Sequence, residues 1–138
     1  MKRFSIVLSG VLLALVLAGC SALPIKPSEV AGEPTVYAKV VNPPDPLLMG
    51  YWRRIPPKEF NRPHVFNYWL VKKGDKYAVF YHWDDKRGKV ARGWFPFVID
   101  GKTMTSSEDP SVYFVRDGEV FHNYGGRPMN SPMMKVRD

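Results

Sequence analysis

The sequence predicts an all-β domain, an antiparallel meander of six to eight strands that forms a small barrel or a strongly curled sheet. Short runs of β-branched and aromatic residues alternate with turns that contain glycine, aspartate or proline. Residues 21–138 show no sustained 3.6-residue apolar period, so little helix is expected. Aromatic residues are dense, with 13 of them between Tyr51 and Phe97. Closing or curling such a meander protects its edge strands.

The chain opens with a short leader that ends at its only cysteine. Lys2 and Arg3 precede an apolar run over residues 4–18. That run is shorter than the roughly 20 residues of a membrane-spanning helix and suits a secretion signal. The sequence Leu17-Ala18-Gly19-Cys20 resembles the lipobox of bacterial lipoproteins.

This resemblance implies that residues 1–19 are a signal peptide and that Cys20 becomes the lipidated first residue of the mature protein. Each buried methylene contributes roughly 0.8 kcal/mol, so two or more acyl chains hold a protein firmly in a membrane. Ser21, rather than an aspartate, follows the cysteine. In lipoproteins this favours the outer membrane, with the protein facing the periplasm. Nucleic acid is therefore not an expected partner.

The mature chain divides into three parts. Residues 20–35 are rich in proline, serine and charged residues, and we expect a flexible tether. Residues 36–127 form the β-domain, and residues 128–138 are expected to be an irregular tail. The strands expected in the β-domain cover residues 36–41, 47–55, 65–73, 76–84, 89–99, 102–105, 111–116 and 119–124.

Two hairpins are predicted from their turn residues. Gly74-Asp75 and Asp117-Gly118 are two-residue turn signals, and the second places Arg116 directly opposite Glu119. Pro96 interrupts a strand-like run and indicates an edge position or a bulge, because proline has no N–H to donate.

Gly50-Tyr51-Trp52 is similar to the Gly-x-Trp motif that opens lipocalin-like barrels. The resemblance implies that Gly50 permits a close backbone approach and that Trp52 closes the barrel floor. It also implies an arginine stacked on Trp52, which is either Arg116 or Arg127.

A set of rings in the hairpin region is the main candidate for function. The simpler interpretation is that these rings form the core. Both faces of the strands carry rings, however, so some should line an apolar pocket or meet a partner. The predicted ligand-binding residues are Trp52, Trp69, Tyr81, Trp83 and Trp94.

Catalysis, a metal site and a cofactor are not expected. The three histidines lack the short spacings of a local chelate. Asp84 and Asp85 lie in a turn beside cations, where solvated turn formers are more common than a general acid–base pair.

The function predicted is that of a non-catalytic, membrane-anchored envelope lipoprotein that binds an apolar or amphipathic small molecule. The alternative is a structural or assembly subunit that docks on another envelope protein. The net charge of +7 suits an anionic neighbour such as lipid head groups. Lys73 and Lys76 flank one turn, and an anion there would relieve their repulsion.

Overall fold

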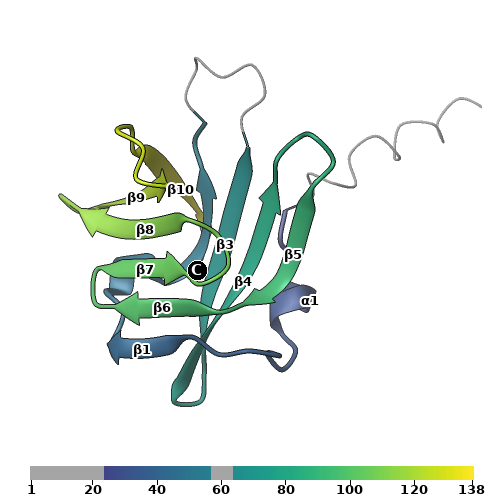
Figure 1. Ribbon diagram of the computed structural model, residues 1–138. Helices are drawn as coiled ribbons and strands as arrows, with labels where there is room; N and C mark the ends of the chain where they lie inside the picture. Colours follow the sequence, from purple (N-terminus) through teal and green to yellow (C-terminus); the bar gives the residue numbers. More distant parts are fainter. Residues whose placement is uncertain (1–23, 57–63) are drawn as a thin grey trace, which may run out of the picture.

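The computed structural model describes residues 24–56 and 64–138 and confirms an all-β fold. The predicted signal peptide and Cys20 lie outside the described residues. In Figure 1 most of the chain forms one curled sheet, with a short helix behind it. The elements are α1 (Pro27–Val30), β1 (Lys39–Asn42), a 3₁₀ turn η2 (Pro46–Leu48), β2 (Gly50–Arg54), β3 (Val65–Lys73), β4 (Lys76–Asp84), β5 (Val90–Phe95), β6 (Phe97–Asp100), β7 (Thr103–Ser106), β8 (Ser111–Arg116), β9 (Glu119–Tyr124) and β10 (Ser131–Arg137).

The sheet is a half-barrel of mixed strand direction. Its ten described strands follow the order β1-β6-β7-β8-β9-β10-β2-β3-β4-β5. All neighbours are antiparallel except β1, which pairs with β6 in parallel. The prediction of six to eight purely antiparallel strands was therefore wrong in number and direction. The connection from β1 to β6 passes through four other strands, so no local hairpin signal could reveal their pairing.

Pro96 marks one corner of the half-barrel. It separates β5, which pairs with β4, from β6, which pairs with β7 and β1. The single strand predicted over residues 89–99 is therefore two strands in different parts of the sheet. A residue without an N–H is tolerated at this point because ladder pairing is interrupted while the chain changes direction.

Strand β10 forms the opposite corner, where the sequence predicts an irregular tail over residues 128–138. Ser131 and Pro132 pair with β9, and the following residues pair with β2. Met133 is buried, and the carbonyl of Pro132 accepts a hydrogen bond from Ile55 N at 2.9 Å. The tail prediction was wrong because only Ser131 and Pro132 pair with the preceding strand β9, whereas the rest of β10 pairs with β2, far away in the sequence.

The main core fills the inside of the half-barrel. Alternation along β3 and β4 directs one set of side chains inward, as the sequence predicts. Trp52 also belongs to this core, and its Nε1 donates to the Met49 carbonyl at 3.0 Å. The buried members are Leu48, Trp52, Phe66, Tyr68, Leu70, Val79, Tyr81, Phe97, Ile99, Met104, Tyr113, Val120 and Met133.

A second, smaller core lies on the outer face of β2–β5. Ile25 and Val30, only 2% and 7% exposed, pack there with Tyr51, Trp69 and Phe80. Residues 24–30 thus cover an aromatic surface that would otherwise face water. This differs from the flexible tether expected for residues 20–35, of which the described part docks on the sheet.

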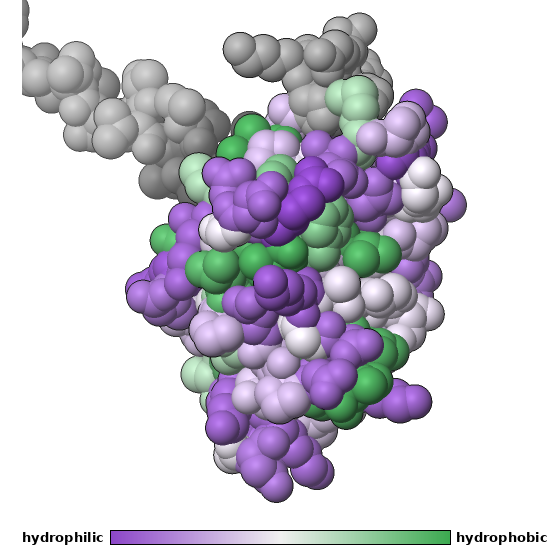
Figure 2. Space-filling model, turned by 90° about the vertical axis from the view of Figure 1, so that its left-hand side faces the viewer, coloured by the Kyte–Doolittle hydropathy of each residue, from purple (hydrophilic) through white to green (hydrophobic). Residues whose placement is uncertain are grey.

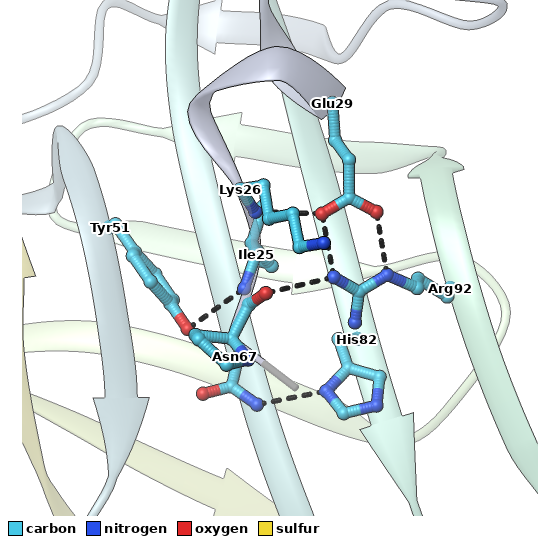
Figure 3. Close-up of polar contacts among 8 residues, drawn as sticks. Ile25, Lys26, Glu29, Tyr51, Asn67, His82 and Arg92 are labelled. Carbon is cyan, nitrogen blue, oxygen red and sulfur yellow. Dashed lines mark hydrogen bonds and ion pairs between the residues drawn. The ribbon is translucent and has the colours of Figure 1, made fainter. Parts of the chain in front are cut away.

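Polar contacts hold this segment in place (Figure 3). The Glu29 carboxylate accepts two hydrogen bonds from Arg92, at 2.7 and 2.6 Å. Arg92 also donates to the Pro24 carbonyl at 3.0 Å, and the Ile25 N–H donates to the Tyr51 hydroxyl at 3.1 Å. We call residues 24–30 the docked segment. The buried residues of both cores lie within residues 25–133.

The predicted hairpins are confirmed. Residues 73 and 76 pair across Gly74-Asp75, and Arg116 pairs with Glu119 across a turn in which both Asp117 and Gly118 have positive φ. The Lys73 ammonium donates to the Val30 carbonyl at 2.6 Å. That contact turns Lys73 toward the docked segment and explains how two lysines can lie opposite each other.

Candidate ligand-binding site in the mouth of the half-barrel

A cavity of about 350 Å³ opens between β4, β5 and the β7–β8 loop. We call it the mouth cavity. Rings form much of its wall, and polar groups gather at the loop. This combination of an apolar wall and a few polar groups is typical of small-molecule sites, although the volume is near the lower end of their range. Its lining residues are Tyr81, Trp83, Lys89, Ala91, Phe95, Ser106, Glu108, Asp109, Pro110 and Tyr124.

Tyr81 and Trp83 reach this cavity because both belong to the inward-facing set of β4. The Tyr81 hydroxyl donates to Asp109 Oδ2 at 2.9 Å, and its ring contacts Phe95 edge to face at a centroid distance of 5.6 Å. The indole Nε1 of Trp83 is buried without a hydrogen-bond partner. A buried donor without a partner is costly.

Behind the cavity lies a buried polar network. Ser111 Oγ is 3.1 Å from the Tyr81 hydroxyl and 2.9 Å from His122 Nε2, and the Tyr113 hydroxyl donates to Tyr81 at 3.0 Å. Burial raises the pKa of Tyr81 and of Tyr113. Burial, followed by the charge of Arg54, lowers the pKa of His122 to about 3. The network is therefore neutral at ordinary pH.

The Ser111–His122 distance would suit a nucleophile and its base, but the surroundings do not. Ser111 is completely buried, and His122 is 1% exposed. A histidine whose pKa is about 3 is a weak base at neutral pH. This pair fits a structural role, which is to fix Tyr81 beneath the cavity.

A second cavity, of about 200 Å³, lies beside the first. We call it the Arg54 cavity. Tyr124 lines both cavities and so forms their common wall. Here the polar groups are basic rather than acidic. The lining residues are Arg54, His122, Tyr124, Arg127, Pro128, Met129 and Ser131.

The five predicted ligand-binding rings are divided among three places. Tyr81 and Trp83 line the mouth cavity. Trp52 lies in the main core, whereas Trp69 and Trp94 belong to the smaller core beneath the docked segment. Ligand binding by these five residues stays a prediction, and the structure brings only Tyr81 and Trp83 together at one cavity.

The residues of the mouth cavity that sequence reasoning missed include Phe95, Asp109 and Tyr124. Tyr124 could have been found from the hairpin over residues 111–124, in which it pairs with Ser111. Phe95 lies at the end of β5 and pairs with Val79 of β4. Asp109 reaches the cavity because the chain changes strand partner at Pro96, whereas the sequence indicates only an edge position or a bulge there.

Neither Arg116 nor Arg127, the two arginines expected to stack on Trp52, lies over its ring. Arg116 lies over Phe114 and Phe121, and Arg127 lies over Tyr124. Lys135 instead places its ammonium 5.9 Å from the Trp52 ring.

The paired aspartates shape the β4–β5 turn. Asp84 accepts from the N–H of Lys86, and Asp85 accepts from the N–H groups of Arg87 and Lys89. They are turn formers as predicted, but they are buried rather than solvated. Within residues 24–56 and 64–138, no cluster of three side chains of the metal-ligating types is present.

Comparison of the chain with protein-family models, with curated proteins and with solved structures finds no match. Among the residues described, no helix is long and apolar enough to span a bilayer.

Proposed function

We propose that the protein is a lipoprotein of the bacterial envelope, anchored through Cys20, whose β-domain binds an apolar or amphipathic small molecule without acting on it chemically. The mouth cavity is the observation that carries this proposal. Trp83, Phe95 and Tyr124 offer apolar surface there, while the loop that contains Asp109 offers polar groups. A molecule with an apolar and a polar part matches both.

The docked segment supports a position close to the membrane. Only four residue steps separate Cys20 from Pro24, whose carbonyl is held by Arg92. Four steps of extended chain span at most about 14 Å. A lipid on Cys20 would therefore keep the β-domain beside the bilayer, where amphipathic molecules are abundant. Because Ser21 rather than an aspartate follows Cys20, we place the protein in the outer membrane, where it faces the periplasm.

The alternative function, an assembly subunit that docks on another envelope protein, is favoured by one observation. Strand β1 ends the sheet, and all four of its residues are exposed, including Val40 at 39% and Val41 at 57%. An exposed edge strand can pair with a strand of a partner. Figure 2 also shows several separate apolar groups between hydrophilic side chains on one side of the molecule.

Native mass spectrometry of the full chain, extracted gently from the envelope of its own host, tests the proposal. We expect an acylated N-terminus at Cys20 and a discrete additional mass that organic extraction removes. A protein without a bound molecule that is recovered with another envelope protein after crosslinking would instead support the assembly function.

A further inference from the structure

The guanidinium of Arg54 is half-buried and has no carboxylate partner among residues 24–56 and 64–138. One of its nitrogens, Nη2, donates to the backbone carbonyl of His64, and its carbon lies 4.7 Å above the ring of Phe66. Its Nε is buried and has no hydrogen-bond partner. The ion pairs found among the described residues include neither Arg54 nor Arg127. A half-buried cation without a counter-ion is unfavourable, so a complementary anion would stabilise this site.

A second cation, Arg127, acts on Arg54. Burial lowers the pKa of the Arg54 guanidinium, Tyr113 and Tyr81 raise it, and the charge of Arg127 lowers it by the smallest amount of the four. The pKa values of His64 and His122 are lowered first by burial and then by the charge of Arg54. The two histidines are therefore neutral near pH 7 and leave the charge of the cavity to the two arginines. A guanidinium presents its N–H groups in a fork that matches a carboxylate or a phosphate.

The two cavities differ in charge and share a wall. In the mouth cavity, Asp109 already accepts from the Tyr81 hydroxyl and from the Ser111 N–H, each at 2.9 Å. Tyr124 lines both cavities, and the Arg54 cavity is lined by Arg54 and Arg127. An anionic group is therefore favoured beside the two arginines and disfavoured beside the Asp109 carboxylate.

We infer that the small molecule is an amphipathic anion: its carboxylate or phosphate binds at Arg54 and Arg127, and its apolar part lies against Tyr124 and Trp83. This inference rests on the proposed function and specifies the ligand class for the same site.

Three probes separate the contributions, namely decanoate, decan-1-ol and inorganic phosphate. Each is titrated by calorimetry and by tryptophan fluorescence into the full chain. We expect decanoate to bind roughly tenfold to a hundredfold more tightly than decan-1-ol, because only decanoate accepts charge-assisted hydrogen bonds from the arginines. Phosphate alone should bind more weakly than decanoate, because it makes no contact with the rings.

The Arg54→Met variant keeps an apolar stem on Phe66 and removes one of the two charges, so the preference for decanoate over decan-1-ol should fall to what Arg127 alone supports. Arg54→Lys keeps a charge and should retain part of the preference. Arg53→Met is the matched control, since the neighbouring residue on β2 points to the opposite face. Thermal unfolding of each variant verifies that it is folded before it is titrated.

Equal affinity for decanoate and decan-1-ol would overturn the inference and leave the proposed function intact. Phosphate that binds as tightly as decanoate would also overturn it, because the site would then recognise a free anion. No binding of either ten-carbon probe would count against the inference and the proposed function together. Loss of the preference in Arg53→Met to the same extent as in Arg54→Met would exclude the assignment to the Arg54 cavity.

Discussion

Glu29 and Arg92 form a two-pronged ion pair in which the Arg92 Nε and Nη2 donate to separate carboxylate oxygens at 2.7 and 2.6 Å. The pair joins the chain just after the predicted lipid anchor to β5. It closes the docked segment over the aromatic rings of the smaller core. The ion pair acts together with the hydrogen bonds of Ile25 to Tyr51 and of Lys73 to Val30.

We predict that Glu29→Gln loosens the docked segment without unfolding the sheet. The side chains are about a quarter exposed, so the loss should be about 1 kcal/mol. Hydrogen exchange of residues 25–31 should accelerate, whereas exchange in β3 and β4 should not change. Glu119→Gln, at an exposed hairpin end, is the control. Equal protection of the segment in both variants would contradict the role given to the ion pair.

The same contact should respond to acid. Hydrogen bonding to Arg92 lowers the pKa of Glu29, so the carboxylate stabilises the docked state above the ordinary carboxyl range of about pH 4.3. This contribution is lost as the pH falls through the lowered pKa. Exchange of the docked segment measured along a pH series should therefore rise in acid, and the rise should be absent from Glu29→Gln.

His122 should make the stability of the whole domain depend on pH. Its pKa is about 3 in the fold and about 6.5 in the unfolded chain, so the unfolded state binds more protons between these values. Stability should therefore fall as the pH decreases through this range, by up to about 1.4 kcal/mol per pH unit. Urea unfolding of His122→Gln should show a smaller slope. His64→Gln, in which a less buried histidine is removed, should keep most of the slope.

Gly50 is required by its backbone. Its φ is +94°, and a Cβ there would lie 2.7 Å from the Arg137 carbonyl oxygen where β10 crosses β2. Gly50→Ala should cost about 1–3 kcal/mol in thermal or urea unfolding. Gly32→Ala has open space around the new Cβ and is the matched control. Equal stability of the two variants would show that β10 does not constrain Gly50.

Two tryptophans should separate binding from stability. Trp52→Ala removes a core ring and should cost about 3–5 kcal/mol. Trp83→Ala removes part of the cavity wall, so we expect a loss of affinity for decanoate with a much smaller loss of stability. Measuring both quantities for both variants tests the division, and a severe loss of stability in Trp83→Ala would assign that ring to the core.

Local patterns in the sequence predicted the hairpins because their turns lie beside the residues that they pair. Alternation along residues 76–84 likewise placed Tyr81 and Trp83 on one face. Strand β10 and the docked segment were missed because their partners are distant in the sequence, as with Lys135 and Trp52. The Arg54 cavity was missed for the same reason. Arg54 and His122 line one cavity because β10 lies between their strands, β2 and β9, in the sheet.

The most direct test of ligand binding in the mouth cavity is the indole N–H region of an NMR spectrum during titration with decanoate. Four tryptophans give four signals, each assignable from a Trp→Phe variant. The signal of Trp83, whose Nε1 has no partner, should shift, while that of Trp52, bonded to the Met49 carbonyl, should not. Shifts confined to Trp69 and Trp94, or no shift at any indole, would contradict binding in the mouth cavity.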